Sequence, residues 1–378
     1  MKQTIINFDN SATSFPKPVS VRRACAEALE RYGGNPGRSG HRLSVRAAEK
    51  IYETRSLAAQ MFGAQPENVA FTANCTYALN MAIKGIMQYG GDMIISPYEH
   101  NSVARPVHRL TETSKVNVSI GRVYDDDDET VKAFEKLITD KTKCICVTAA
   151  SNVTGRVLPI KKLGDLCKRH GLCFIVDGAQ ACGVQELKLS DGMNFICTAG
   201  HKSLYGPSGT GLLITDGEFP LSTIIEGGTG ATSAELVQTP TMPEKLESGT
   251  VNTVGIIGLG EGIRFVKRQG IDRIRQHEEK LCRRFIEGAG TVRGIKFYDA
   301  HANRLPIAAF NIGDIPSEQI ASALSEKGFA LRGGLQCAPL AHKTIGTLSQ
   351  GAVRFSPSVF NSEKQVDRLV SALKTLAV

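Results

Sequence analysis

"KCICVTAASNVTGRVLPIKKLGDLCKRHGLCFIVDGA" (residues 143–179) contains two apolar runs with an amphipathic stretch between them. Residues 143–150 and 172–179 have the length and composition of buried strands. Residues 160–171 place apolar side chains at helical spacing and end at Gly171, a residue typical of helix C-termini. Two buried strands joined by a helix predict a parallel β-α-β unit.

The same alternation extends to both sides of this unit. Further strand-like runs occur at residues 68–73, 92–97, 194–200 and 209–215, and a helical stretch follows the first of them at residues 75–87. Strands that alternate with helices predict an α/β layer with a mainly parallel sheet.

The pattern changes after Gly249. A long helical stretch covers about residues 255–289, strand-like pieces follow at 305–313 and 351–357, and a last helix covers 362–376. These short strands and helices predict a smaller α+β domain.

The composition is that of a globular protein with a sizeable core, because 42% of its 378 residues are apolar and 22% are charged. The formal net charge is +8, but Lys and Arg are scattered, so we expect an anionic small molecule and no nucleic acid as ligand. Ten cysteines without a CxxC pair predict neither a disulfide framework nor a zinc site. Because no apolar run spans a membrane and the first residues lack a signal-peptide core, we expect a cytoplasmic protein and no membrane partner.

Polar side chains follow five of the predicted strands, at the point where each strand ends. In chain order they are Asn74, Cys75 and Thr76; Glu99 and His100; Ser151 and Asn152; Asp177 and Gln180; His201 and Lys202. Because the carboxyl ends of parallel strands meet at one edge of a sheet, we expect these residues to converge there.

These residue types suit one cofactor in particular. A lysine amine such as that of Lys202 can form a Schiff base with an aldehyde, and the carboxylate of Asp177 can pair with a protonated pyridine nitrogen. An imidazole can stack on an aromatic ring, and a helix N-terminus can hold a phosphate. Together these features predict a site for pyridoxal phosphate.

Several motifs, in this order, resemble those of the class V aminotransferase family, and specifically its cysteine desulfurase branch. They are "FDNSATSFPKP" (8–18), "GNPGRSGHRLS" (34–44), "SPYEHNS" (96–102), "SNVTG" (151–155), "DGAQACG" (177–183), "TAGHKSLYGPSGTGLL" (198–213), "ESGTVNT" (247–253) and "RGGLQCAPLAH" (332–342). The resemblance covers nearly the whole chain. It implies fold type I of the pyridoxal phosphate enzymes, with a seven-stranded sheet in a large domain (14–254) and a small domain made of 1–13 and 255–378.

The resemblance also implies roles for individual residues. The cofactor would be held by Lys202 through the Schiff base, Asp177 at the pyridine nitrogen, His100 stacked on the ring, Gln180 at the phenolic oxygen, Thr76, Cys75 and His201 at the phosphate, and Thr250 from the second subunit of a homodimer, with Asn152 as a further cofactor-binding residue. The substrate, L-cysteine or L-selenocysteine, would be bound through Asn152, Arg354 and Arg332, and its sulfur would be taken up by Cys337. The catalytic residues would be Lys202, Cys337 and His100.

Ordinary structural roles stay open for some of these residues. Asp177 can cap a helix, His100 can be a loop histidine, Asn152 can be a turn residue, Arg354 and Arg332 can form ion pairs, and Cys337 can be one of ten structural cysteines.

The chain also departs from the family pattern at several positions. Leu335 and Gln336 stand where the family often has histidines, Cys75 replaces a second threonine near the phosphate, and Ala199 replaces a serine. Because residues 338–353 alone separate the cysteine from the carboxylate-binding arginine, the chain resembles the short-loop branch, which depends on a sulfur-acceptor protein. Selenocysteine lyase, transamination, β-elimination from a cysteine conjugate and a non-catalytic sulfur carrier are the alternative functions.

Overall fold

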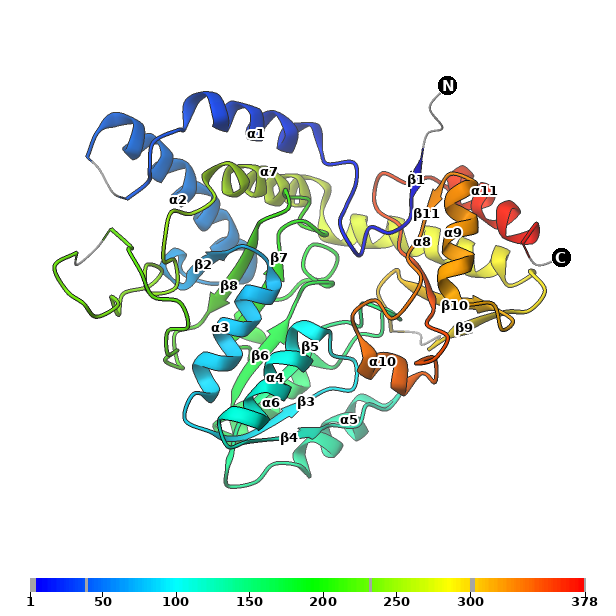
Figure 1. The fold of residues 1–378 in the computed structure, drawn as a ribbon, viewed down its shortest axis with the longest axis horizontal. Coiled ribbons are helices and arrows are strands. Elements are labelled where there is room, and N and C mark those ends of the chain that lie inside the picture. The colour runs from blue at the N-terminus through cyan, green and yellow to red at the C-terminus, as the bar shows by residue number, and fades with distance from the viewer. Residues whose placement is uncertain (1–4, 38–39, 231–232, 300–302, 377–378) are drawn as a thin grey trace.

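The central sheet has the mainly parallel α/β architecture that the sequence predicts. The computed structural model describes residues 5–37, 40–230, 233–299 and 303–376, so residues 38 and 39 of the "GNPGRSGHRLS" motif lie outside the described residues. The seven strands of this sheet follow the order β2-β8-β7-β6-β5-β3-β4, and β8 alone among them runs antiparallel to its neighbours (Figure 1). Their bounds are β2 Val69–Thr72, β3 Gly91–Ile95, β4 Val116–Ile120, β5 Thr142–Thr148, β6 Cys173–Asp177, β7 Phe195–Ala199 and β8 Gly211–Thr215.

The edge strand β4 is the one strand of this sheet that the sequence patterns do not identify. It pairs with β3 alone, and most of its residues are at least partly exposed. The central strands β5, β6 and β7 are buried almost throughout and therefore read as continuous apolar runs.

Both faces of the central sheet are covered by helices. Alternate residues of β5 belong to different cores: Ile145 and Val147 pack into one cluster, Cys144 and Cys146 into the other. Cys144 and Cys146 therefore point the same way, into one core. The helices of the chain are α1 Val19–Arg31, α2 Arg42–Phe62, α3 Cys75–Met87, α4 Asn101–Thr113, α5 Asp127–Glu135, α6 Ile160–His170, α7 Thr253–Gln269, α8 Ile271–Ala289, α9 Ser317–Glu326, α10 Pro339–Thr344 and α11 Glu363–Lys374, with 3-10 helices at Pro66–Asn68 and Leu189–Asp191.

The helix predicted at residues 160–171 is α6, and Gly171 closes it with a φ of 63°. The long helical stretch predicted near residues 255–289 is two helices, because Gly270 between α7 and α8 has a φ of 84° and no helix continues through that conformation. α7 packs against α1 and α2 over the central sheet (Figure 1). The core over the central sheet therefore includes residues of α7, such as Leu259.

The small unit combines both ends of the chain (Figure 1). β1 (Ile6–Asn7) pairs in parallel with β11 (Phe329–Ala330), and β12 (Val353–Phe355), β10 (Ala308–Ile312) and β9 (Ile295–Tyr298) form an antiparallel sheet in that order. Phe8 and Phe355 share its core with α8 and α11. The N-terminal strand is thus paired with a strand from the last quarter of the chain, and the domain bounds that the resemblance implies stay a prediction.

A buried acid links the large unit to α8. The hydroxyl of Tyr205 donates a hydrogen bond to Glu278 Oε1 at 3.3 Å, and both side chains are buried. Burial raises the pKa of Glu278 from 4.5 to about 8. Between pH 4.5 and about 8, Glu278 therefore stays protonated in the folded protein but is ionised in the unfolded chain.

We expect the Glu278→Gln variant to gain stability relative to the wild type as the pH rises from 5 to 8. A carboxyl with a raised pKa contributes stability that is present below pH 4.5 and is lost as the pH approaches about 8, at a slope of at most about 1.4 kcal/mol per pH unit. Glutamine keeps the hydrogen bond and does not titrate. Thermal unfolding midpoints of both proteins at pH 5, 6, 7 and 8 measure this difference, and a difference independent of pH contradicts the assignment.

Candidate active site

The carboxyl ends of the parallel strands surround a cavity of about 300 Å³. Its lining includes Asn74, Cys75, Thr76, His100, Asn152, Asp177, Gln180, His201, Lys202, Arg332 and Arg354. The predicted convergence of the strand-end side chains is therefore confirmed. Glu99 and Ser151 are the exceptions among the strand-end residues, because both are fully buried and do not line the cavity.

Asp177 ends β6 and is 4% exposed. Its Oδ1 accepts hydrogen bonds from the backbone N of Ala179 at 2.9 Å and from Cys75 Sγ at 3.4 Å. Within the described part of the chain, Oδ2 has no hydrogen bond. Oδ1 is thus fixed in place, and Oδ2 is the oxygen left to accept a ring N–H.

Cys75 donates to Asp177 because its thiol stays protonated. Burial raises the pKa of this thiol well above its ordinary value, and the charge of Asp177 acts in the same direction. The resemblance implies that Cys75 belongs to the phosphate site. In this structure its sulfur has the Asp177 carboxylate as partner, which leaves its backbone N–H at the start of α3 for the phosphate.

Lys202 follows β7 and is partly buried in the cavity wall. Burial lowers the pKa of its ammonium, and the charge of Asp177 opposes this shift. A lowered pKa increases the fraction of neutral amine, which is the form that condenses with an aldehyde. The glycine-rich segment after it turns tightly, since Gly209 has a φ of 78°.

The N-terminus of α3 and His201 form the most suitable place for an anion. The Asn74 side chain caps α3 by accepting a hydrogen bond from the backbone N of Tyr77 at 3.1 Å. The N–H groups of the first residues of the helix have no partner within the helix and can donate to an anion. His201 Nδ1 is buried and lacks a hydrogen-bond partner among the residues described. A buried polar nitrogen without a partner is costly, so it fits a bound phosphate.

His100 caps α4 and lines the cavity at the same time. Its Nδ1 accepts a hydrogen bond from the backbone N of Ser102 at 3.0 Å. Burial, reinforced by the charge of Lys202, lowers the pKa of His100 to about 4. The ring is therefore neutral at pH 7, in the form suited to stack on an aromatic cofactor.

Ser102 is a site residue that the sequence analysis did not single out. Its hydroxyl lies 2.8 Å from His100 Nδ1 and 2.7 Å from Thr76 Oγ1, so it connects the stacking and phosphate residues. Ser11 is a second one, because its carbonyl accepts a hydrogen bond from Gln180 Nε2 at 3.1 Å. Their positions in the "SPYEHNS" and "FDNSATSFPKP" motifs are the signals that could have found them.

Arg354 lies on β12 and is 1% exposed. Its guanidinium donates to the carbonyl of Asn152 at 2.9 Å and to Asp9 Oδ1 at 2.5 Å, so it does form an ion pair. Its Nε is buried and lacks a partner among the described residues. The pair therefore holds Arg354 at the cavity while leaving a donor for a substrate carboxylate.

Cys337 is exposed, whereas eight of the other cysteines are buried and Cys25 is partly buried. Arg332 Nη2 lies 3.4 Å from its sulfur. The backbone N of Asn101 donates to the carbonyl of Cys337 at 2.7 Å, which attaches the cysteine loop to the start of α4 beside His100. Cys337 thus differs from the structural cysteines in exposure and in having a cationic neighbour.

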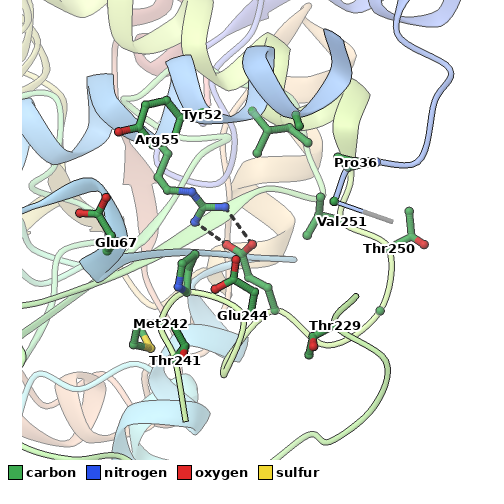
Figure 2. Close-up of a pocket in the computed structure, with 16 residues that line it drawn as sticks. Pro36, Tyr52, Arg55, Glu67, Thr229, Thr241, Met242, Glu244, Thr250 and Val251 are labelled. Atoms are coloured by element: carbon green, nitrogen blue, oxygen red, sulfur yellow. Dashed lines mark hydrogen bonds and ion pairs between the residues drawn. The ribbon is translucent and has the colours of Figure 1, made fainter. Parts of the chain in front are cut away.

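Thr250 lies outside this cavity. It is exposed and lines a second cavity of about 460 Å³ (Figure 2). The wall of this cavity also carries the ion pair of Arg55 with Glu247. Asn35 Nδ2 donates to Thr250 Oγ1 at 3.3 Å. Thr250 therefore does not contact the phosphate region of its own chain, and its contribution to a second subunit stays a prediction.

The family follows from a comparison over nearly the full length. Residues 6–369 match the family of class V aminotransferases. This chain belongs to that family. A probable cysteine desulfurase from Pyrococcus abyssi is 33% identical and is matched over 100% of this chain and 95% of its own length. A cysteine desulfurase from Salmonella choleraesuis is 32% identical over 96% of this chain and 91% of its own.

The fold of a solved relative agrees with this assignment. The structure of a cysteine desulfurase from Thermococcus onnurineus superposes with a TM-score of 0.91 at 31% identity, covering 99% of this chain and 94% of that chain. Members of the family use pyridoxal phosphate, and the cavity fits this group. Lys202 suits its aldehyde, Asp177 Oδ2 its pyridine nitrogen, and His201 with the α3 N-terminus its phosphate.

Within the described residues, no group of three or more His, Cys, Asp or Glu side chains is placed to hold a metal ion. Among the helices described, none combines the length and the hydrophobicity needed to cross a bilayer.

Proposed function

We propose that this protein is a pyridoxal phosphate-dependent cysteine desulfurase that converts L-cysteine to L-alanine and stores the sulfur as a persulfide on Cys337. The observation that carries the proposal is the pairing of a partly buried amine in the cavity with an exposed thiol. Lys202 lines the cofactor cavity. The carbonyl of Cys337 accepts a hydrogen bond from the backbone N of Asn101, which follows His100 of the cavity wall, and the Cys337 sulfur lies 3.4 Å from Arg332 Nη2. The names of the relatives support the same activity.

When bound, pyridoxal phosphate supplies an aldehyde that condenses with amines and a ring that accepts electrons from the substrate. Asp177 keeps the ring nitrogen protonated through Oδ2, and neutral His100 orients the ring. Lys202 Nζ takes the proton from the α-carbon of the substrate and returns one later, because its lowered pKa suits a general base.

The sulfur-transfer step balances without an external oxidant. The Cys337 thiolate attacks the substrate sulfur, an S–S bond forms, and the carbon–sulfur bond breaks with its electrons left on carbon. Protonation of that carbon gives L-alanine. The products are L-alanine and the persulfide of Cys337, and Arg332 Nη2 lies 3.4 Å from the sulfur that attacks.

Arg354 is expected to bind the α-carboxylate of the substrate. We expect Arg354→Gln to raise the KM for L-cysteine by about 10- to 100-fold, because a charged hydrogen bond contributes about 1.5–3 kcal/mol. Steady-state kinetics of alanine release measure the change. Asp9→Asn is the control, because Asp9 is the ion-pair partner of Arg354. If both variants lose stability equally and keep the wild-type KM, Arg354 has only the structural role.

Alanine release tests the proposal as a whole. The purified protein, loaded with pyridoxal phosphate, is given L-cysteine or L-selenocysteine together with a reductant, and the alanine released is measured. In a second sample without reductant, which would remove the outer sulfur of a persulfide, the peptide that contains Cys337 is analysed by mass spectrometry. Alanine from L-cysteine with 32 Da added to that peptide, about one sulfur, is the expected result. Alanine from L-selenocysteine alone identifies a selenocysteine lyase, and formation of product that depends on a keto acid identifies a transaminase.

We also propose that the protein is a cytoplasmic homodimer that passes its sulfur to an acceptor protein. The exposure of Thr250, remote from its own site, supports a contribution to the second subunit's phosphate site. The ten unpaired cysteines are consistent with a reducing compartment. The exposure of Cys337 suits transfer to another protein. Sedimentation analysis of the wild type tests the dimer, and a monomer with full activity contradicts it.

A further inference from the structure

Gln336 directly precedes Cys337, yet its side chain is 2% exposed while the cysteine is exposed. Both residues have left-handed backbone conformations, with φ values of 41° and 58°. Residues that carry a Cβ rarely adopt this conformation, and it persists only where the surroundings hold it. The orientation of the Cys337 thiol therefore depends on contacts made by its neighbours in the loop.

The carboxamide of Gln336 is fully used in hydrogen bonds within the small unit. Its Nε2 donates to the carbonyls of Ala352 at 2.7 Å and Arg332 at 3.2 Å, and its Oε1 lies 2.9 Å from His342 Nε2. Two carbonyl acceptors require the NH₂ group at that end, so the amide oxygen faces the histidine. Because an amide oxygen only accepts, His342 carries its proton on Nε2.

His342 is itself held from the other side. It lies on α10, it is fully buried, and its Nδ1 is 2.7 Å from the hydroxyl of Thr347. Nδ1 accepts from this hydroxyl because Nε2 already carries the proton. Burial lowers the pKa of His342, so the ring stays neutral at pH 7. Thr347, His342 and Gln336 therefore form one chain of hydrogen bonds, which we name the Gln336 clamp.

The backbone of the same two loop residues is bound to the large unit. Asn152 Nδ2 donates to the carbonyl of Gln336 at 2.8 Å, and the N–H of Asn101 donates to the carbonyl of Cys337 at 2.7 Å. The loop is thus held through the Gln336 side chain on one side and through its carbonyls on the other. Of these two residues, only Cys337 has an exposed side chain, and its sulfur lies beside Arg332.

We propose that the Gln336 clamp positions Cys337 for attack on the substrate sulfur. Gln336 and His342 are positioning residues in this proposal, which rests on the proposed function. It also gives a physical reason for a departure from the family pattern. The residue that stands where relatives often have a histidine holds the loop in this chain and does not face the thiol as an acid or base.

The Gln336→Met holoenzyme tests the clamp, because methionine has a similar length and makes none of these hydrogen bonds. We expect the rate of persulfide formation on Cys337 in a single turnover with L-cysteine to fall by about 10- to 100-fold, the size of effect expected from a misplaced reacting group. The KM and the bound cofactor should stay close to wild type, while the thermal midpoint should fall, because two carbonyls and the His342 N–H lose their buried partner. Leu335→Ala, at the exposed neighbouring position, is the matched control and should keep the wild-type rate.

A double-mutant cycle separates positioning from general stability. Because Gln336 and His342 act through one hydrogen bond, adding His342→Leu to Gln336→Met should slow persulfide formation little further. If the two substitutions act independently, so that their separate reductions in the rate of persulfide formation multiply in the double variant, the proposed clamp is wrong. A wild-type rate in Gln336→Met overturns it, and so does a rate that falls only in proportion to lost cofactor.

If the wild type forms no persulfide at all, the proposed function fails, and the clamp is judged by a second measurement. The rate at which iodoacetamide alkylates Cys337 in the holoenzyme, followed by mass spectrometry of its peptide, depends directly on the position and surroundings of the thiol. If the clamp positions the thiol, the alkylation rate differs between wild type and Gln336→Met but not between wild type and Leu335→Ala. Equal rates in all three proteins overturn the clamp.

Discussion

Replacing Lys202 with alanine is expected to abolish alanine release from L-cysteine, with a loss of about 1,000-fold or more. Positioned acid–base groups contribute about 100- to 10,000-fold, and this amine is also the attachment point of the cofactor. The structure supports the assignment because Lys202 lines the cavity with Asp177 and burial lowers its pKa. Alanine quantified by chromatography after incubation with L-cysteine measures the loss.

Borohydride reduction gives a readout independent of turnover. In the wild type it should add the mass of the reduced cofactor to the peptide containing Lys202, and in Lys202→Ala no peptide should gain this mass. The Lys267→Ala variant is the control, because this lysine is on the surface of α7, where its Nζ donates to Gln60 Oε1 at 2.9 Å. Cofactor attached to any lysine other than Lys202, or near-normal turnover in Lys202→Ala, contradicts the assignment.

The arrangement of the strand-end residues could be predicted because it depends on one topological fact. Parallel strands place their carboxyl ends at one edge, so residues such as Asp177 and Lys202 meet there whatever the details of packing. The apolar runs of β5 and β6 are strong signals because both faces of these strands are buried. The edge strand β4 lacks that signal because it is partly exposed.

The contacts that tune the site could not be predicted, because they depend on side-chain direction across elements far apart in sequence. The contact of Cys75 with Asp177 joins the start of α3 to the end of β6. The ion pair of Arg354 with Asp9 joins β12 to the first residues of the chain. Sequence patterns predict that Cys75 and Asp177 lie near one another but do not determine which atoms meet, and they do not predict that Asp9 lies beside Arg354.

The position of Cys337 is a similar case. The glycine-rich sequence around it, "RGGLQCAPL", is typical of an exposed loop, and Cys337 is exposed in the structure. The interpretation of Gln336 as the absence of a helpful histidine did not anticipate a buried carboxamide with three hydrogen bonds, because burial at a single loop position has no periodic signal. That carboxamide is what makes the conformation of the cysteine specific.

Replacing Cys337 with alanine is the second change with a very large expected effect. Desulfuration of L-cysteine should fall below detection, because the variant has no thiolate to accept the sulfur, while Lys202 and the cofactor cavity stay intact. The cofactor absorbance, and its spectral response to added L-cysteine, should therefore resemble the wild type. Cys25→Ala is the matched control, since Cys25 is partly buried and does not line the cavity, and it should form the Cys337 persulfide at the wild-type rate. Normal alanine release from L-cysteine in Cys337→Ala excludes the persulfide mechanism, because no other cysteine in the chain is exposed enough to replace it.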